Sequence, residues 1–209
     1  MRATGGTFYE GREAGGVDVI AGGFDPGLAK SAVAIVGREG NRLSLLHRAL
    51  IVTKPDQPDI VRIKTILSAL SGPILKYHPI VLGIEDQSGV SVAARMQGKR
   101  AAEAHAKGQK APGGAGYNSN NDGVLGVVGL AKCAALVYGS RYKMLHPQTI
   151  KIAVLGKGGR SGKKADMIAA VRALFPELQV PGVKLSEHEA DAIAMAILAL
   201  RVDLVGEMQ

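Results

Sequence analysis

Four side chains of this 209-residue sequence are of types that bind divalent metal ions. Asp25 and Glu85 each end an apolar run typical of a β-strand, and His188 and Asp191 lie three residues apart in the last helical pattern. Three carboxylates in one dry pocket repel one another unless cations neutralise them. Carboxylate oxygens with one imidazole suit Mg²⁺ or Mn²⁺, and two such ions would activate a water and stabilise the leaving oxygen at a phosphodiester. The residue types therefore indicate phosphodiester cleavage, provided that the fold brings these side chains together.

The stretch around Asp25 predicts a hairpin. An apolar run at residues 19–24 precedes Asp25, Pro26 and Gly27 stop the strand, and a second strand-like run follows at residues 31–36. Asp before Pro-Gly is also ordinary turn chemistry, because the side chain can cap its own backbone. The hairpin alone is therefore weak evidence for a site, and a catalytic role depends on other carboxylates arriving at the same end of the sheet.

The next part of the sequence predicts two further strands with a helix between them. Residues 42–52 predict a third strand, and the short connections favour antiparallel neighbours. Asp59 is expected to cap a helix that Pro73 kinks or ends. Residues 79–86 form a continuous apolar run typical of a strand buried on both faces, and this run also ends in acid.

A second helix is predicted over residues 124–138, in which Gly126 and Gly129 would permit close packing. Cys133 in this helix is expected to be a buried small hydrophobic residue and not a nucleophile. The remaining predicted elements are a strand at residues 142–147 and helices at residues 147–155, with Pro147 in the first turn, and 165–175.

The last helix begins with a capping box. Ser186 is the expected N-cap, and Glu189 would fold back to its amide, which gives Glu189 a structural role and removes it as a preferred metal ligand. His188 and Asp191 point the same way from the first turns because residues three apart share a helix face. They form a candidate half-site for a metal ion.

Composition indicates a globular protein with an anionic partner. The chain is 46% apolar and 21% charged, and its length suits a single domain, expected over residues 17–209 after a loose tail at residues 1–16. The net charge of +8 suggests a polyanion, although charge for solubility explains it equally well. A single cysteine excludes an internal disulfide framework and fits a reducing cytoplasm. No run approaches the length of a membrane span.

Two segments concentrate the basic residues. Residues 88–122 combine positive charge with a Gly/Asn-rich end and are expected to be a mobile binding surface. Residues 156–164 resemble a phosphate-binding P-loop, but Lys157 stands where its first glycine belongs and Lys164 replaces the Ser/Thr. This loop is better interpreted as a contact with a phosphate backbone. The candidate DNA-binding residues in the two segments are Arg95, Lys99, Arg100, Lys157, Arg160, Lys163 and Lys164.

The order of these motifs resembles a RuvC-type Holliday-junction resolvase. The motifs are residues 22–27, Ile84-Glu85, residues 147–164 and residues 188–192, and the resemblance covers about residues 19–200. It implies an α/β, ribonuclease H-like fold, with a five-stranded mixed sheet whose first three strands are antiparallel and which is flanked by helices. It also implies a homodimer that binds four-way junction DNA and nicks two opposed strands.

The resemblance also implies roles for individual residues. Asp25 would bridge two Mg²⁺ ions, for which Mn²⁺ could substitute, Glu85 would hold one ion, and His188 with Asp191 would hold the other. Lys151 and Lys164 match positions where lysines of the family meet the DNA backbone near the cut, and Lys164 could help to stabilise the departing 3′-oxygen.

Three features depart from the family pattern. Many relatives carry Asp where His188 stands, and the imidazole would shift metal preference towards Mn²⁺. An aromatic wedge is absent after Glu85, so junction opening would rely on residues 88–122. The extension before the first strand is atypical, and such divergence suggests a phage or prophage source.

Other functions stay open at this point. A ribonuclease H-like nuclease could instead cut other branched DNA or RNA, and a non-catalytic DNA-binding module would also be basic. Asp-Pro-Gly after a first strand occurs in actin-like sugar kinases and ATPases too, but these need two such domains and 209 residues are too few.

Overall fold

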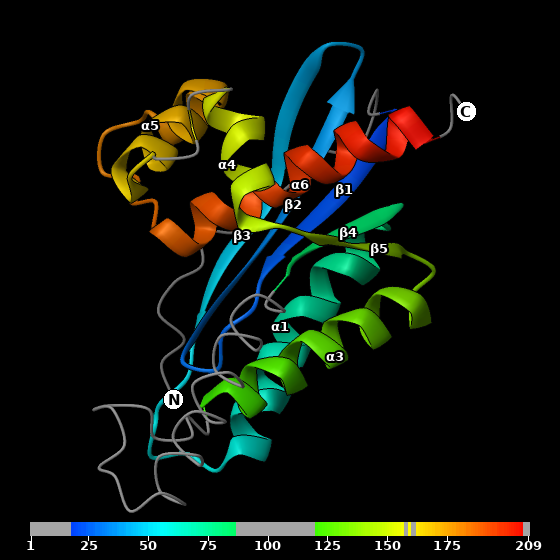
Figure 1. Ribbon diagram of the computed structural model, residues 1–209, viewed down its shortest axis with the longest axis vertical. Coiled ribbons are helices and arrows are strands. Elements are labelled where there is room, and N and C mark those ends of the chain that lie inside the picture. The colour runs from blue at the N-terminus through cyan, green and yellow to red at the C-terminus, as the bar shows by residue number, and fades with distance from the viewer. Residues whose placement is uncertain (1–17, 87–119, 157–158, 160–161, 207–209) are drawn as a thin grey trace, which may run out of the picture.

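The computed structural model describes residues 18–86, 120–156, 159 and 162–206. These residues form one sheet with helices on both of its faces (Figure 1). The strands are β1 (Val19–Asp25), β2 (Lys30–Glu39), β3 (Arg42–Val52), β4 (Val81–Glu85) and β5 (Arg141–Leu145). The helices are α1 (Asp59–Tyr77), α3 (Asn120–Val137), α4 (Pro147–Leu155), α5 (Lys164–Leu174), the 3₁₀ helix η2 (Pro176–Leu178) and α6 (Glu187–Gly206).

The five strands lie in the order β3-β2-β1-β4-β5. β1, β2 and β3 pair antiparallel, whereas β4 pairs parallel to β1 and β5 pairs parallel to β4. The mixed sheet with three antiparallel leading strands is therefore confirmed. Because β1 and β4 run in the same direction, the acids that end them lie at the same edge of the sheet.

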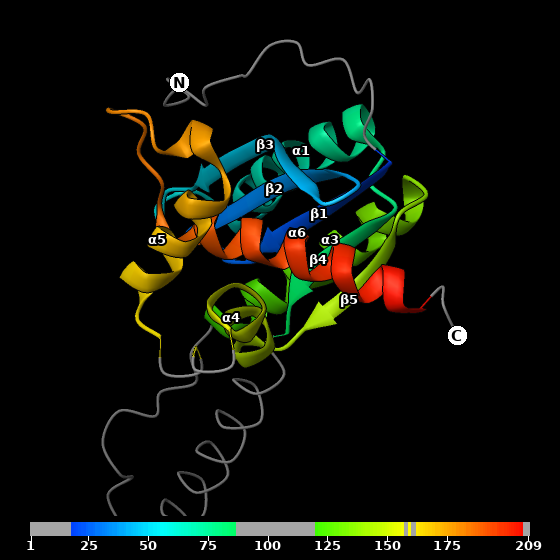
Figure 2. The same cartoon turned by 90° about the horizontal axis from the view of Figure 1, so that it is seen from above.

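Two hydrophobic clusters cover the two faces of the sheet. α4, α5 and α6 pack on one face, around Met167, Phe175 and the buried side of α6, and α1 and α3 pack on the other, around Leu70, Ile74 and Ala131 (Figures 1 and 2). α6 is buried over most of residues 190–200, in keeping with its near-continuous apolar sequence. A helix buried to this extent holds its first turn in a fixed position over the sheet.

The approach of α6 to β1 depends on Gly23. A Cβ atom at Gly23 would lie 2.0 Å from the backbone oxygen of Ala192 and 2.5 Å from the backbone nitrogen of Ala196. No real side chain tolerates such distances from helix backbone. Gly23 therefore lets α6 lie directly against β1, two residues before Asp25.

Helix α1 differs from the prediction at its N-cap, and of the two alternatives predicted for Pro73 the ending of the helix is excluded. Pro58 is its N-cap and Asp59 its first residue, so Asp59 does not cap it. Pro fits this boundary because its fixed φ and missing N–H cost little before a first turn. Pro73 does not end the helix, which continues to Tyr77. The ring of Pro73 is buried against the core, and this burial offsets the lost hydrogen bond.

Helix α3 also corrects the sequence analysis. Its first turn includes residues 120–122, which were assigned to the preceding basic segment. Cys133 is exposed because it lies off the buried face that carries Val127, Ala131 and Ala134. Gly126 and Gly129 permit no close packing, since a Cβ on either would meet nothing within 4 Å among the described residues.

The expected tail at residues 1–16 lies outside the described residues, as does the basic segment up to residue 119. Among the helices that the structure does describe, none is both long and apolar enough for a membrane span.

Candidate active site

Asp25 and Glu85 end adjacent parallel strands. The register pairs Phe24 of β1 with Ile84 of β4, so the residue that follows each lies beside the other. Paired residues of parallel neighbours are about 4.8 Å apart and point to the same face of the sheet. Asp25 is only 7% exposed, and Glu85 is half-buried. The strand register therefore places these two carboxylates beside each other at one end of the sheet.

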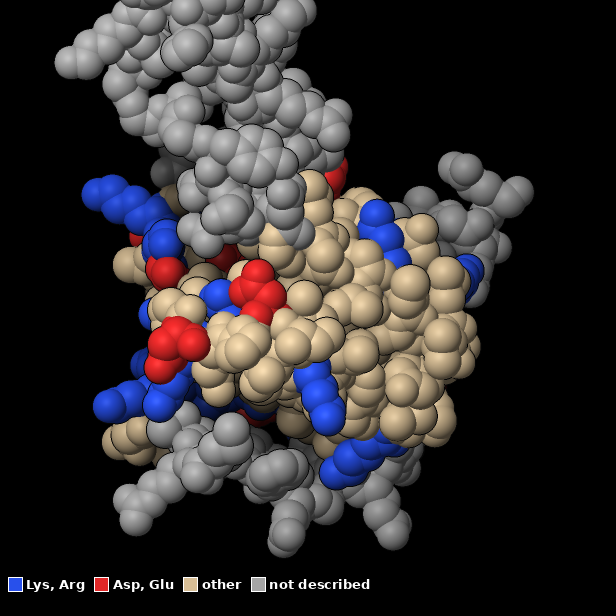
Figure 3. Space-filling view, turned by 90° about the horizontal axis from the view of Figure 1, so that it is seen from below, with Lys and Arg blue, Asp and Glu red and all other residues tan. Residues whose placement is uncertain are grey.

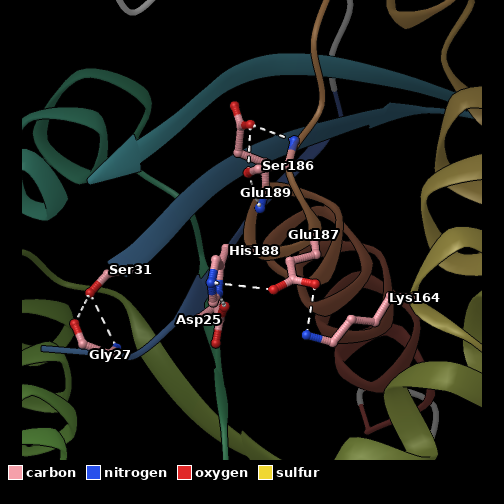
Figure 4. A network of polar contacts seen from close by, with 8 residues as sticks. All are labelled: Asp25, Gly27, Ser31, Lys164, Ser186, Glu187, His188 and Glu189. Atoms are coloured by element: carbon pink, nitrogen blue, oxygen red, sulfur yellow. Dashed lines mark hydrogen bonds and ion pairs between the residues drawn. The ribbon is translucent and has the colours of Figure 1, made fainter. Parts of the chain in front are cut away.

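The turn after Asp25 is closed by Ser31. The Ser31 hydroxyl donates to the Gly27 carbonyl and accepts from the Gly27 amide, whose nitrogen lies 3.2 Å away (Figure 4). A Cβ at Gly27 would lie 2.1 Å from the Lys30 carbonyl oxygen, so the turn has no room for a side chain. This compact turn holds the carboxylate of Asp25 at the strand end.

His188 meets Asp25 directly. The Nδ1 atom of His188 lies 2.6 Å from Oδ2 of Asp25, and the two side chains are 29% and 11% exposed (Figure 4). The hydrogen bond to Asp25 raises the pKa of His188 above its ordinary value, against the opposing effect of burial. Residues separated by 163 positions in the chain thus share one contact.

Asp191 adds a third carboxylate near this pair. Burial, followed by the charge of Asp25, raises the pKa of Asp191 to about 6, and His188 partly opposes this. Both causes of the rise disfavour the charged form of the carboxyl group. A cation would stabilise that charged form.

The donor set fits Mg²⁺ or Mn²⁺ in kind. Asp25, Glu85 and Asp191 offer carboxylate oxygens and His188 an imidazole nitrogen, the types that hard and borderline divalent ions accept. Among the described residues, no three His, Cys, Asp or Glu side chains converge closely enough to hold an ion as they stand. The Asp25–His188 hydrogen bond joins two atoms that would both be ligands, so an ion would have to replace that contact.

A lysine lies at the outer side of the cluster. Nζ of Lys164 is 2.7 Å from Oε2 of Glu187, and Oε1 of Glu187 is 3.8 Å from Nε2 of His188 (Figure 4). The hydrogen bond between Lys164 and Glu187 raises the pKa of the lysine and lowers that of the glutamate. Lys164 is also the first residue of α5, where the helix dipole disfavours a cation.

The other predicted DNA-binding residues are only partly described. Lys151 on α4 donates to the backbone oxygen of Gly162, 3.3 Å away, and Lys163 is exposed immediately before α5. Lys157, Arg160, Arg95, Lys99 and Arg100 lie outside the described residues. Figure 3 shows one face of the molecule on which Lys and Arg gather mainly towards one side, with Asp and Glu among them, beside a broad area with few charges.

Sequence reasoning missed three polar residues around the site. Glu187 lies between Lys164 and His188 and contacts both. The charge of Lys30 helps to lower the pKa of Glu187, after the larger effect of Lys164. Arg48 forms an ion pair with Glu189. Glu187 sits directly beside His188 in sequence, and that proximity was a usable signal. The contact of Arg48 crosses 141 residues and had no local signature.

Comparison with known proteins places this arrangement in a family. The family model described as crossover junction endodeoxyribonuclease RuvC matches residues 21–101. The RuvC endonuclease of Zymomonas mobilis is 30% identical over 177 residues, which are 84% of this chain and 86% of that protein. The RuvC of Citrifermentans bemidjiense is 30% identical over 175 residues, covering 84% and 88%.

Solved structures agree on the fold. Thermus thermophilus RuvC aligns with a TM-score of 0.64 at 19% identity, over 90% of this chain and 97% of that one. The same protein in complex with a Holliday junction substrate aligns with a TM-score of 0.67 at 20% identity, over 90% and 96%.

The sheet and its two helical layers define a ribonuclease H-like α/β fold. Within that fold class the chain belongs to the RuvC family. This is a family of metal-dependent nucleases that generally use Mg²⁺.

Proposed function

We propose that this protein is a structure-specific DNA endonuclease that resolves four-way junctions by paired, symmetric nicks. The observation that carries the proposal is the 2.6 Å contact between Asp25 and His188, which brings the last helix to the acid that ends the first strand, in a chain of the RuvC family. The raised pKa of Asp191 supports it, because burial and the charge of Asp25 disfavour an ionised carboxylate that a bound cation would stabilise.

Two divalent ions would be held by the four candidate ligands. Asp25 would contribute to both sites, Glu85 to one, and His188 with Asp191 to the other. When bound, Mg²⁺ would activate water and neutralise charge at a phosphodiester, and Mn²⁺ would substitute. The protein's own contribution is to hold these side chains on packed elements at one end of the sheet, where their charges act together on the phosphodiester.

The basic residues would bind and orient the DNA backbone. Lys151, Lys163 and Lys164 lie on or beside α4 and α5, and Arg95, Lys99, Arg100, Lys157 and Arg160 are proposed to bind the DNA as well. Lys164 would exchange Glu187 for the scissile phosphate and place its ammonium group near the departing 3′-oxygen. A fixed ammonium group stabilises the negative charge that develops there.

Two nicks in opposed strands require two active sites. We therefore infer a homodimer, with residues 17–209 of each copy acting as one nuclease domain. Light scattering coupled to size-exclusion chromatography, with and without junction DNA, tests this. A monomer in both conditions contradicts the dimer.

The decisive experiment incubates the purified protein with a synthetic four-way junction, with and without Mg²⁺. We expect symmetric nicks that need metal. Asp25→Asn should abolish nicking and retain junction binding, because it removes a ligand charge without altering the turn. Asp18→Asn is the matched control: the Asp18 carboxylate accepts a 3.1 Å hydrogen bond from the Gly40 amide at the opposite end of β1.

Two outcomes would count against the proposal. Unchanged nicking by Asp25→Asn removes the site assignment. Faster cleavage of a linear duplex, another branched DNA or an RNA–DNA hybrid than of the junction replaces the substrate while leaving the fold and metal chemistry in place.

A further inference from the structure

Arg48 on β3 connects the sheet to the segment that precedes α6. Its Nη1 atom lies 3.0 Å from the backbone oxygen of Lys184 and 2.5 Å from Oε1 of Glu189. The side chains of Arg48 and Glu189 are 9% and 11% exposed. One guanidinium therefore binds the chain on both sides of Ser186, across 136 and 141 residues of sequence.

The other oxygen of Glu189 completes the arrangement. Oε2 accepts from the Ser186 amide at 2.9 Å and from its hydroxyl at 2.8 Å, while the Glu189 amide donates back to the hydroxyl at 3.2 Å. The capping box is confirmed, and Glu189 has a second partner that the sequence did not indicate. His188 lies inside this bonded turn, and from it His188 and Glu189 point in different directions (Figure 4).

A stabilising role alone is a poor explanation for this pair. Desolvation of two charges cancels much of their attraction, so a buried ion pair is often no more stable than two apolar side chains. What the pair does supply is a direction, because one Nη1 group that donates to both the Lys184 carbonyl and the Glu189 carboxylate ties the two sides of the turn to β3. The ring of His188 is the group whose position that direction determines.

We propose that Arg48 and Glu189 are positioning residues for the candidate metal site. Glu189 closes the turn that carries His188, and Arg48 anchors this turn to β3, so that the imidazole reaches Asp25. The inference rests on the proposed function, since it takes His188 and Asp25 as metal ligands. Neither Arg48 nor Glu189 touches the metal or the DNA in this scheme.

The test replaces the pair by apolar side chains of similar length. Arg48→Met/Glu189→Met avoids leaving one charge buried alone, and Ser186 still caps the Glu189 amide position through its hydroxyl. Arg62→Met is the matched control, because the side chain of Arg62 is 10% exposed, close to the 9% of Arg48, but binds Thr53 and Asp59 instead. Arg48→Lys serves as a second variant, which keeps the charge and places a single ammonium group, on a shorter side chain, where Nη1 now donates to both acceptors.

Three measurements separate positioning from folding. Thermal unfolding reports stability, and Mn²⁺ titration followed by electron paramagnetic resonance reports metal affinity without DNA. Proton NMR of the metal-free protein reports the downfield imidazole N–H of His188 that the Asp25 hydrogen bond protects. We expect the double variant to unfold near the wild-type temperature, to bind Mn²⁺ about tenfold more weakly and to lose the downfield signal, as loss of ligand-orienting partners does elsewhere. Arg48→Lys should show a smaller loss, and Arg62→Met none.

The opposite results overturn the inference. We call the contact of Arg48 with Lys184 and Glu189 the Arg48 clamp. A folded double variant with wild-type Mn²⁺ affinity and an intact downfield signal shows that the position of His188 does not depend on this clamp. If Arg62→Met loses as much Mn²⁺ affinity and downfield signal as the double variant, the effect is a general loosening of the fold and not positioning. If the double variant does not fold, Arg48→Lys decides: wild-type Mn²⁺ affinity and a wild-type downfield signal in this variant also contradict the inference. If the wild-type protein neither binds Mn²⁺ nor nicks DNA, the proposed function is wrong. The downfield His188 signal of the wild type and of the double variant still shows whether the Arg48 clamp positions His188.

Discussion

The candidate site has a buried half and an exposed half, and they are held in place by different means. Asp25 and His188 meet where α6 packs against β1, with side chains 11% and 29% exposed. Lys164 and Glu187 meet at the surface, with side chains 76% and 38% exposed. Packed elements and the turn that Arg48 binds hold the first pair, whereas an ion pair between exposed side chains holds the second. Substitutions should therefore disturb the packing or the metal chemistry in the buried half and substrate binding in the exposed half.

Gly23→Ala should have the largest effect, because it breaks the packing of the buried half. The added methyl would lie 2.0 Å from the Ala192 backbone oxygen. Because this atom belongs to the helix backbone, no side-chain rotation can relieve the clash. We expect a loss of about 3 kcal/mol or more in unfolding free energy, the upper end for overpacking, and loss of nicking. Chemical denaturation followed by circular dichroism measures it.

Gly126→Ala in α3 is the matched control for this substitution. Its methyl would meet nothing within 4 Å of the described residues, and Ala is favoured over Gly inside a helix by up to about 1 kcal/mol. It should leave stability unchanged or raise it. Similar destabilisation by the two substitutions would show that the β1–α6 contact has no special place in the fold.

His47 offers a second perturbation of the packed part, through pH. Burial, and then the charge of Lys76, lowers the pKa of His47 from 6.5 to about 4. Its Nε2 atom is buried without a hydrogen-bond partner among the described residues. As pH falls below 6.5, His47 becomes protonated in the unfolded chain, whereas in the folded protein it stays neutral until about pH 4. Stability contributed by the neutral ring is thus present above pH 6.5 and lost towards pH 4, by about 1 to 3 kcal/mol.

Denaturation of His47→Phe at several pH values measures this contribution. The variant should lose less stability than the wild type between pH 6.5 and 4, since Phe keeps a ring opposite Tyr77, 6.2 Å from centroid to centroid. His78→Asn is the control, because His78 is exposed and Asn tolerates its φ of 48°. Identical pH slopes for His47→Phe and the wild type would contradict the assignment.

His188→Asp should have a smaller effect, on the choice of metal in the buried half. A carboxylate in place of the imidazole makes the ligand set all oxygen, which favours Mg²⁺ over Mn²⁺. We expect the ratio of nicking rates in Mn²⁺ and Mg²⁺ to fall several-fold while junction binding is unchanged. A wild-type protein with a marked Mg²⁺ preference, or a ratio that the substitution does not move, would contradict this.

The buried half could be predicted in part because its signals are local. An apolar run that ends at Asp25 or Glu85 places a carboxylate at a strand end whatever packs around it, and Ser186 with Glu189 forms a box within one turn. Glycine was harder to interpret. Gly23 and Gly126 both lie in apolar sequence, and only the tertiary arrangement shows that one faces helix backbone and the other open space.

Contacts over long sequence distances were beyond prediction for the same reason. The clamp from Arg48 and the ion pair between Lys164 and Glu187 depend on how three elements meet on one face of the sheet. Cys133 shows the related limit for a helix. Its apolar neighbours indicated burial, but α3 is apolar over so much of its surface that the sequence did not define which side faces the core.

Glu187→Gln should have the smallest effect, and it tests the exposed half alone. A surface ion pair of this kind contributes at most about 1 kcal/mol, so unfolding should hardly change. Glu187 competes with phosphate for Lys164, so its loss should tighten junction binding and steepen the dependence of log Kd on log salt by up to about one unit. Glu39→Gln changes the net charge equally at the far end of β2 and should leave this slope as in the wild type. If both variants steepen it alike, net charge alone drives binding and Lys164 holds no special contact with DNA. If Glu187→Gln instead destabilises the fold as Gly23→Ala does, the division of the site into a packed half and a charged half is wrong.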